Sequence, residues 1–379
     1  MFICEKCGNS DERFVGTKNG EQYCRKCIIF SGESVDYKPS RKRVVFPDLH
    51  YPLSSDQKEI SDKIVSNFRN RIDTLVYAVC GSGKTEISYG VLAYAVSQGL
   101  RVGFALPRRD VVIELFWRLK EAFKKLDVVA VYGQHTNKLE GDIVILTTHQ
   151  LFRYPNYFDL LVMDEIDAFP YKGNDVLVSL YKKSLRGNCV MMSATPSNEI
   201  LNEFRQENHE ILELRTRFHK QPIPVPKVII QIPLLQEASI IKKLIEFKKN
   251  GKPCFVFAPT QAMCEKLYFK IRMFVRKGDY LHSQRDDRDK IINRLKKGEL
   301  DYLVTTSVLE RGVTVRNLQV IIYRADDERI YDSSTLIQTA GRAGRKMDAP
   351  TGEVIFFAEK ETEDIKNAIR EIEFCNTFL

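Results

Sequence analysis

The sequence has 379 residues, which is enough for two or three domains of ordinary size. Its hydrophobic fraction of 44% is typical of a folded globular protein, and no apolar run approaches the roughly 18 residues of a membrane span. The 58 Lys and Arg residues exceed the 50 Asp and Glu residues only mildly, so charge alone does not predict nucleic-acid binding.

The N-terminus lacks the basic segment and apolar run of a signal peptide, and we expect a cytoplasmic protein. Nine cysteines in such a protein indicate metal ligands or buried thiols rather than disulfides. Four of them form two C-x₂-C pairs separated by sixteen residues: Cys4, Cys7, Cys24 and Cys27. This spacing predicts a structural zinc ribbon over residues 1–37, built on a short hairpin. Four reduced cysteines without a metal are the alternative.

Residues 38–52 are polar and interrupted by proline, and they predict a linker. The segment after Leu53 predicts the start of a helix, because a serine fits the cap position and Asp56 and Gln57 fit the first turn. Gln57 also stands where motor proteins often place a glutamine that contacts adenine. A glutamine on a helix surface is the alternative.

A phosphate-loop pattern follows a predicted buried strand and precedes a predicted helix. Its eight residues are Ala78-Val79-Cys80-Gly81-Ser82-Gly83-Lys84-Thr85, with Ala78 where the general pattern has glycine. The glycines and Ser82 would let the backbone N–H groups face a polyphosphate. Lys84 would reach the β- and γ-phosphates, and the Thr85 hydroxyl would ligate Mg²⁺. A glycine-rich turn with a chance Lys-Thr is the alternative.

Further apolar stretches alternate with helical segments after residue 102, which predicts a doubly wound parallel sheet. The loops at the carboxyl ends of such strands contact ligands. Arg108 and Arg109 follow one of these strands and Thr148 follows another, so we assign them to contacts with a DNA backbone. Exposed loop residues without any function are the alternative.

Two adjacent acids, Asp164 and Glu165, come directly after an apolar strand over residues 160–163. Asp164 would bind Mg²⁺, and Glu165 would orient and deprotonate the attacking water. A solvent-facing acidic turn is the alternative, although it is less favoured with a phosphate loop upstream.

Three prolines at alternate positions within residues 214–227 predict a domain boundary, because proline interrupts both helices and central strands. We therefore expect a first nucleotide-binding domain over 53–215, a linker over 216–235 and a second α/β domain over 236–379. The second domain lacks a phosphate loop. It has instead Arg342 and Arg345, three apart on one face of a predicted helix. Directed at the γ-phosphate across a closed cleft, such arginines increase the rate by about 10³–10⁵.

Residues 53–346 resemble the superfamily-2 helicases and translocases. The motifs occur in the family's order: Gln57, AVCGSGKT, ALPRRD, ILTTHQL, DEID, SAT, FAPT, TTSVLERGVT and QTAGRAGR. Each short motif is weak alone, but nine in order are highly specific. The four-cysteine ribbon and the segments TTHQL, MDEIDAFPY and LERGVT resemble the ComFA family of bacterial competence motors.

The resemblance implies two tandem RecA-like domains after a zinc ribbon, with ATP and Mg²⁺ held mainly by the first. It implies that Gln338 contacts the γ-phosphate or its water, and that Gly312 belongs to the motif that links DNA to nucleotide. It also assigns Thr260 and Thr306 to DNA contacts. Related motors often have aspartate where this chain has Thr314, which puts a ribose contact there in doubt.

The resemblance further implies an ATPase that is stimulated by single-stranded DNA and draws transforming DNA into the cytoplasm, near the inner face of the membrane channel. The implied partners are a ComFC-like phosphoribosyltransferase-fold protein, a DprA-like protein, the competence channel and further copies of the chain. A primosomal-type replication-restart helicase and an ATP-gated scaffold are the alternatives. Restart helicases usually have further zinc ligands in the helicase body, and this sequence has no second cysteine cluster.

Overall fold

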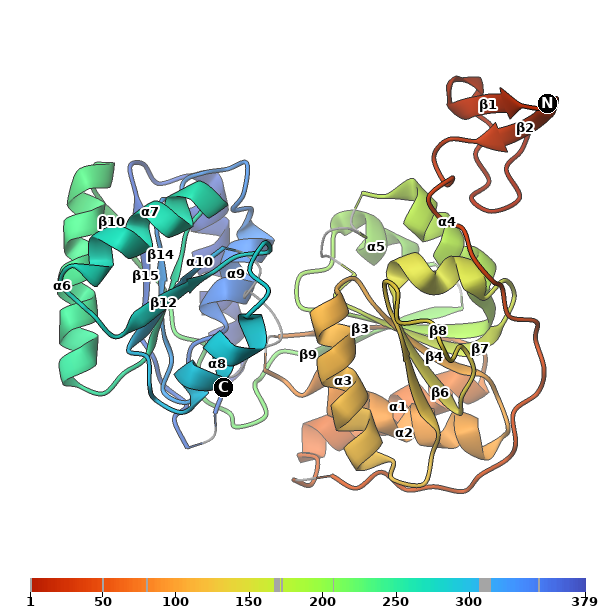
Figure 1. The fold of residues 1–379 in the computed structure, drawn as a ribbon. Helices are drawn as coiled ribbons and strands as arrows, with labels where there is room; N and C mark the ends of the chain where they lie inside the picture. The colour runs from red at the N-terminus through yellow and green to blue at the C-terminus, as the bar shows by residue number, and fades with distance from the viewer. Residues whose placement is uncertain are drawn as a thin grey trace. The chain divides into compact units, whose positions relative to one another are not determined.

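The computed structural model describes residues 2–49, 51–79, 81–166, 171, 173–206, 208–306, 315–346 and 348–379. The chain forms two compact units (Figure 1). Unit 1 consists of residues 1–78 and 83–214, and unit 2 consists of residues 79–82 and 215–379. No helix in the described part of the chain is long and apolar enough to span a membrane.

The N-terminal end of unit 1 is a small antiparallel hairpin. It consists of a short 3₁₀ turn, η1 (Glu12–Phe14), and two strands, β1 (Val15–Lys18) and β2 (Glu21–Cys24). The turn between the strands contains Asn19 and Gly20, both in the left-handed region that these residue types tolerate. The predicted hairpin is therefore present.

A seven-stranded sheet, parallel throughout, forms the body of unit 1, with the strand order β5-β6-β4-β7-β8-β3-β9. Alternate residues of its strands enter the two hydrophobic cores on opposite faces, as Val162 and Leu161 of β7 do. The strands are β3 (Asp73–Ala78), β4 (Val102–Leu106), β5 (Val128–Val131), β6 (Ile143–Thr147), β7 (Phe158–Asp164), β8 (Leu185–Ser193) and β9 (His209–Leu214). The helices are α1 (Ser55–Arg69), α2 (Lys84–Ser97), α3 (Arg109–Ala122), η2 (Thr148–Arg153), α4 (Asp175–Ser184) and α5 (Asn198–Glu203).

Unit 2 is built on a six-stranded parallel sheet with the order β10-β15-β14-β11-β13-β12. Its strands are β10 (Lys227–Ile230), β11 (Cys254–Phe257), β12 (Gly278–Leu281), β13 (Tyr302–Thr305), β14 (Gln319–Ile322) and β15 (Val354–Ala358). Its helices are α6 (Pro233–Lys249), α7 (Gln261–Arg272), α8 (Arg288–Lys296), α9 (Ser333–Ala340) and α10 (Glu363–Asn376). Each unit is a RecA-like doubly wound domain, as the sequence predicted.

The segment between the hairpin and α1 lies along the surface of unit 1. Backbone N–H groups of Ser40, Arg43 and Asp48 donate to carbonyls of unit 1 at 3.0, 3.3 and 2.8 Å. Val35 is buried in one core, and Val45 and Leu49 pack against the other. Much of the predicted linker is thus bonded to the domain that follows it.

Candidate ATPase site

The predicted phosphate loop joins β3 to α2, two elements of unit 1, while residues 79–82 of the loop itself are grouped with unit 2. Gly83 caps α2 with φ of 83°, a backbone conformation that glycine adopts at no steric cost. The Lys84 Nζ donates to the Ala78 carbonyl at 3.3 Å, so its chain folds back toward the loop. The Arg118 guanidinium on α3 pairs with Glu86 at 2.5 Å and fixes the first turn of α2. The N-terminus of α2 therefore has the geometry of an anion-binding turn.

Gln57 lies beside this loop and is buried. A Cβ atom at Gly83 would collide with the Gln57 Nε2 atom. The Oε1 atom of Gln57 accepts a hydrogen bond from the Ser54 backbone N–H at 2.9 Å. The backbone N–H of Gln57 donates to the Ser54 hydroxyl at 3.3 Å. The two residues form a capping box at the start of α1, so Gln57 has a structural role in addition to the predicted contact with the base.

Asp164 and Glu165 stand at the carboxyl end of β7. One strand, β8, separates β7 from β3, so the acids and the phosphate loop lie at the same edge of the sheet. Glu165 has a φ of 61°, which is uncommon for a residue other than glycine. Its N–H donates to the Asp164 Oδ1 at 2.8 Å and to the Met192 carbonyl at 3.1 Å. Strain of this kind is found at catalytic turns.

Ser193, at the end of the intervening strand β8, is fully buried between these two groups of residues. Its Oγ atom accepts a hydrogen bond from the Thr195 N–H at 2.9 Å. The SAT motif therefore begins at the end of the strand that lies between β3 and β7. Two pairs of predicted catalytic residues follow the carboxyl ends of β3 and β7: Lys84 with Thr85, and Asp164 with Glu165. This arrangement fits a site that holds phosphates, Mg²⁺ and a water molecule.

The residues predicted to contact DNA also stand at carboxyl ends of strands. Arg108 and Arg109 follow β4, and Thr148 follows β6, which pairs with β4. The Thr148 side chain is 1% exposed, and the Arg109 guanidinium lies over the Tyr132 ring at 5.2 Å. In unit 2, Thr260 follows β11 and caps α7, while Thr306 follows the neighbouring strand β13. Their contacts with DNA stay predictions.

The predicted helical face of Arg342 and Arg345 is wrong. Helix α9 ends at Ala340, and Gly344 has a φ of 65°, so both arginines lie in the turns after the helix. Glycines in this segment end the helix because they lower its stability and allow the left-handed turn. Arg342 is buried, and the Arg345 Nε donates to the Gly341 carbonyl at 2.9 Å. Gln338 lies within α9 and is buried, whereas Gly312 lies outside the described residues.

Arg217 holds this turn, a role that the sequence does not predict. It is one of the largest fully buried side chains in the described part of the protein. Its Nη1 donates to the carbonyls of Ala343 and Gly344 at 3.0 and 2.9 Å, and its Nη2 donates to that of Gly341 at 3.2 Å. The His219 Nε2 lies 3.0 Å from the same Gly344 carbonyl, and burial lowers the pKa of this histidine, which favours the neutral ring. No sequence motif points to this role.

The four predicted zinc ligands converge. All are buried, and their sulfur atoms lie within 4.8 Å of one another. The Cys4 and Cys27 sulfurs are 3.3 Å apart, and the Cys7 and Cys24 sulfurs are 3.6 Å apart. A tetrahedral zinc with four thiolates requires sulfur separations of about 3.8 Å. The donor set therefore fits a closed structural metal site, in which zinc would stabilise a hairpin too small to fold by its own core.

This hairpin packs against the rest of unit 1 through the residues that follow its second strand. The Phe30 ring stacks on His149 of η2 with centroids 5.9 Å apart, and it also contacts Phe152. The Arg153 Nη1 donates to the Glu33 carbonyl at 2.9 Å. On the other side, the Lys183 ammonium of α4 donates to the backbone carbonyls of Cys4 and Glu5. The cysteine cluster is thus bonded to the α/β body of unit 1 through η2 and α4.

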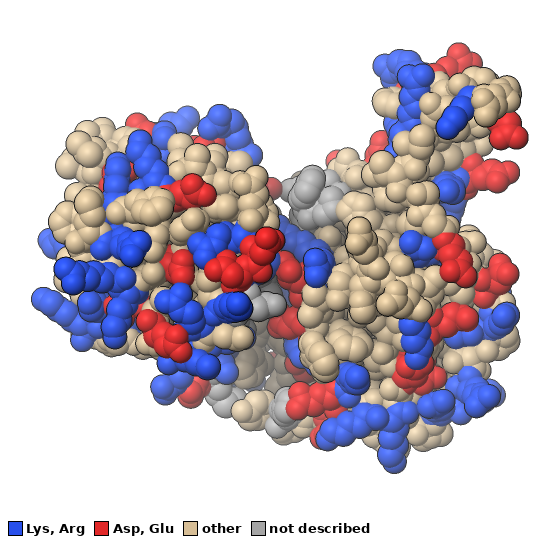
Figure 2. All heavy atoms as spheres, in the orientation of Figure 1, with Lys and Arg blue, Asp and Glu red and all other residues tan. Residues whose placement is uncertain are grey.

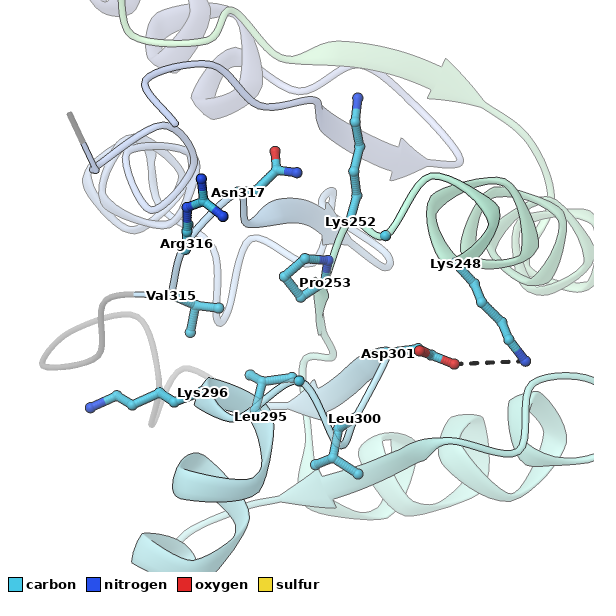
Figure 3. A pocket seen from close by; sticks show the side chains of 12 residues that line it. Lys248, Lys252, Pro253, Leu295, Lys296, Leu300, Asp301, Val315, Arg316 and Asn317 are labelled. Carbon is cyan, nitrogen blue, oxygen red and sulfur yellow. Dashed lines mark ion pairs between the residues drawn. The ribbon is translucent and has the colours of Figure 1, made fainter. Parts of the chain in front are cut away.

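A cavity of about 260 Å³ lies elsewhere in unit 2, at the amino ends of β11, β13 and β14. Four cations line it: Lys248, Lys252, Lys296 and Arg316. In Figure 3, Lys248 points toward Asp301, with which it forms an ion pair at 3.7 Å, while Lys296 points outward. The cations do not converge on one point, and the cavity is remote from the carboxyl edge of this sheet. It has no part in the candidate site.

Comparison with known proteins agrees with this geometry. Residues 54–204 match the DEAD/DEAH box helicase family, and residues 236–347 match the helicase conserved C-terminal domain. The competence protein ComFA of Bacillus subtilis is 31% identical over 99% of this chain and 86% of its own length. ComFA of Streptococcus pneumoniae is 32% identical over 99% of this chain and 90% of its own length. The chain belongs to the ComFA family.

The Mycobacterium smegmatis helicase Lhr, solved with single-stranded DNA and AMP-PNP, has a similar fold. Its TM-score is 0.61 at 17% identity, over 86% of this chain and 50% of Lhr. This ComFA family member is therefore a superfamily-2 ATPase of the helicase type, with helicase domains that imply ATP and Mg²⁺.

Proposed function

We propose that this ComFA family member is an ATP-driven motor that translocates on single-stranded DNA and serves the uptake of transforming DNA. The observation that supports it most is the position of the phosphate loop and the Asp164–Glu165 pair at one edge of the unit 1 sheet. The match to competence proteins over 99% of the chain supports the biological setting. The DNA-bound Lhr structure supports single-stranded DNA as the track.

In this proposal the residues at the carboxyl ends of β3 and β7 bind and orient ATP. The backbone of Gly81, Ser82 and Gly83 and the Lys84 ammonium hold the phosphates, and Thr85 and Asp164 are the groups suited to Mg²⁺. Bound Mg²⁺ would neutralise phosphate charge. Glu165 orients the attacking water and accepts its proton. Gln338, Arg342 and Arg345 are proposed to contact the γ-phosphate region and neutralise the charge that develops there.

The remaining predictions belong to the same proposal. Zinc in the four-cysteine cluster follows from the spacing of the cysteines, and DNA contacts of Arg108, Arg109 and Thr148 follow from their positions after strands. DNA contacts of Thr260 and Thr306 follow from the family resemblance. The resemblance also implies a ComFC-like partner, a DprA-like partner and the membrane channel. The domain boundaries at residues 37, 52, 215 and 235 follow from the cysteine spacing and the proline-containing segments. A place at the inner face of the membrane would be reached through such partners.

The test is the ATPase rate with single-stranded DNA, duplex DNA, RNA and no nucleic acid, in the wild type and in Lys84→Ala. We expect single-stranded DNA to stimulate the wild type most and Lys84→Ala to hydrolyse no ATP while it stays folded. Normal turnover in Lys84→Ala would remove the phosphate-loop assignment. Duplex unwinding would favour a restart helicase, and an ATPase that ignores nucleic acid would favour a scaffold.

A further inference from the structure

One stretch of unit 2 accounts for most of the net charge of the protein. Residues 236–301 hold 16 Lys and Arg residues against nine Asp and Glu residues, while the whole chain holds 58 against 50. The stretch covers most of α6 and all of β11, α7, β12 and α8. Figure 2, in which unit 2 lies on the left, shows many blue Lys and Arg side chains on its visible face. A concentration of this kind attracts polyanions.

Within this stretch, bulky apolar side chains are exposed at the C-terminal end of α7 and in the turn after it. The exposed fractions are 54% for Phe269, 72% for Met273 and 62% for Phe274. Lys266, Phe269 and Met273 follow each other at helical spacings of three and four, so they share one face. Adjacent exposed apolar groups of this size mark a surface that binds a partner.

The cations around these side chains are available to a ligand. Lys266, Arg272, Arg276 and Lys277 are exposed, and none is within 4.0 Å of an acid whose side chain the structure describes. Their neighbours differ in this respect, since Lys270 pairs with Glu237 at 2.5 Å. Cations without acidic partners can neutralise phosphates without first breaking an ion pair.

The Phe269 ring is held in place by other rings. Its centroid lies 5.3 Å from that of Tyr268 and 6.1 Å from that of Tyr280 on the edge strand β12. Tyr268 and Tyr280 are themselves 4.9 Å apart, and the Arg285 guanidinium lies 4.6 Å from the Tyr280 centroid. A ring fixed in this way loses little rotamer freedom when a flat group stacks on it.

The position of this surface differs from that of the predicted DNA contacts. Thr260 caps the N-terminus of α7, and the twelve residues of the helix separate its two ends by about 18 Å. The surface therefore lies at the opposite end of α7 from the predicted contact of Thr260 at the carboxyl edge of the sheet, and it lies beside β12, the edge strand.

We propose that Lys266, Phe269, Arg272, Met273, Phe274, Arg276 and Lys277, which we name the α7 platform, form a second contact for single-stranded DNA. Bases stack on Phe269 and Phe274, and the four cations bind the phosphates, as in proteins that bind single strands without sequence preference. The inference rests on the proposed function, because it extends the DNA path of the same motor. Anionic lipid is the competing ligand for exposed Phe, Met and Arg side chains.

The first test measures the affinity for oligothymidylate as a function of salt. Arg276→Gln with Lys277→Gln should weaken binding about tenfold and reduce the magnitude of the salt slope by about 1.4, since each lost phosphate contact removes about 0.7 on single strands. The matched control replaces two exposed cations elsewhere in unit 2, Lys360→Gln with Arg370→Gln, and should change neither quantity. The ATPase rate without DNA should stay unchanged in both variants.

The second test detects stacking directly. The chain has one tryptophan, Trp117 in unit 1. In a Trp117→Phe background, Phe274→Trp places the single indole on the platform, and stacked bases should quench its fluorescence at saturating DNA. Phe269→Leu keeps apolar area but removes the ring, so it should weaken DNA binding about fivefold, whereas Phe269→Trp should restore it.

The outcomes separate the two proposals. A wild type that binds no single-stranded DNA contradicts the proposed function. A wild type that binds, with both platform variants binding equally well, overturns the α7 platform alone. Flotation with vesicles of phosphatidylglycerol and phosphatidylcholine tests lipid as the ligand. If vesicle binding depends on Arg276 and Lys277 while DNA binding does not, the surface binds lipid, and the proposed DNA contact of the α7 platform is overturned.

Discussion

The Arg217 guanidinium donates a hydrogen bond to the Gly344 carbonyl at 2.9 Å, across 127 positions of sequence. The turn that Gly344 belongs to contains Arg342 and Arg345, which the family resemblance assigns to the γ-phosphate. Their positions therefore depend on a buried cation that does not need to touch the nucleotide. We regard Arg217 as a positioning residue.

Replacement of Arg217 by methionine should lower the turnover number for ATP at least tenfold with little change in KM, because the arginine turn loses its anchor. Loss of three hydrogen bonds to a buried charge should also reduce the free energy of unfolding by about 3 kcal/mol. Arg217→Lys should recover part of the rate, and Arg370→Met, at an exposed position, serves as control. The measurement is the turnover number and KM for ATP in steady-state kinetics on folded protein. An unchanged turnover number in Arg217→Met would contradict the positioning role.

Gly83→Ala should weaken ATP binding and destabilise unit 1 by about 1–2 kcal/mol. The φ of 83° is unfavourable for alanine, and the added methyl group would collide with the Gln57 amide. Gly298→Ala separates the effect of the positive φ from that of the collision. Gly298 has a similar φ of 74°, but a methyl group there would meet open space. Titration with a fluorescent ATP analogue provides the measurement. Equal affinity in Gly83→Ala and the wild type would argue against a close fit at this position.

The purified protein should contain about one zinc ion per chain, because four buried thiols converge at distances that suit one tetrahedral ion. Cys24→Ser should reduce the metal content to near zero and expose the hairpin to protease. Cys375→Ser changes a cysteine outside the cluster and should leave the metal content unchanged. Elemental analysis distinguishes these results, and metal-free wild type with a protease-resistant hairpin would rule out the zinc ribbon.

Lys183→Met should loosen the hairpin from α4, because the ammonium group bonds the backbone carbonyls of Cys4 and Glu5. Amide exchange should then rise in residues 4–9 without loss of zinc. The neighbouring Lys182 contacts Glu203 instead, at 3.7 Å, so Lys182→Met is a matched control. Exchange rates that match the wild type in both variants would show that the contact contributes nothing to docking.

Stability should fall as the pH drops below about 6.5, the ordinary pKa of histidine. Burial lowers the pKa values of His149 and His219, so the folded protein favours their neutral forms. The stability that comes from burying neutral imidazoles is fully present above the pKa of histidine in the unfolded chain. It is lost as the pH falls toward the lower pKa of these histidines in the folded protein. His149→Phe keeps a ring against Phe30 and should make the fall in melting temperature shallower. A pH profile parallel to that of the wild type would contradict this assignment.

The sequence predicted the central strands well, since β4, β6 and β11 are continuous apolar runs buried on both faces. It did not predict β9, β10 or β12, nor β15, which is a buried apolar run inside the sheet. In β9 polar and apolar residues are mixed, and β10 and β12 are short strands at the sheet edges, where one side has no partner strand. Such strands depend on their neighbours more than on their own composition.

The candidate site could be predicted where the chemistry lies in a local pattern, as in the phosphate loop and the Asp164–Glu165 pair. The role of Arg217 could not, because its acceptors are backbone carbonyls distant in sequence, and any residue type provides a carbonyl. The end of α9 at Ala340 was missed for another reason. The spacing of two arginines suggested a helical face, while the glycines between them ended the helix.

The residues before α1 set a practical limit on how the protein can be shortened. A fragment that starts at residue 54, where the helicase match begins, would lack Phe30, Val35 and Val45, and would leave the hydrocarbon that they cover open to water. It would also lose the backbone bonds from Ser40 and Asp48. Such a fragment should aggregate or precipitate. A minimal recombinant motor therefore has to keep its first fifty residues for their packing, whether or not zinc binding is under study.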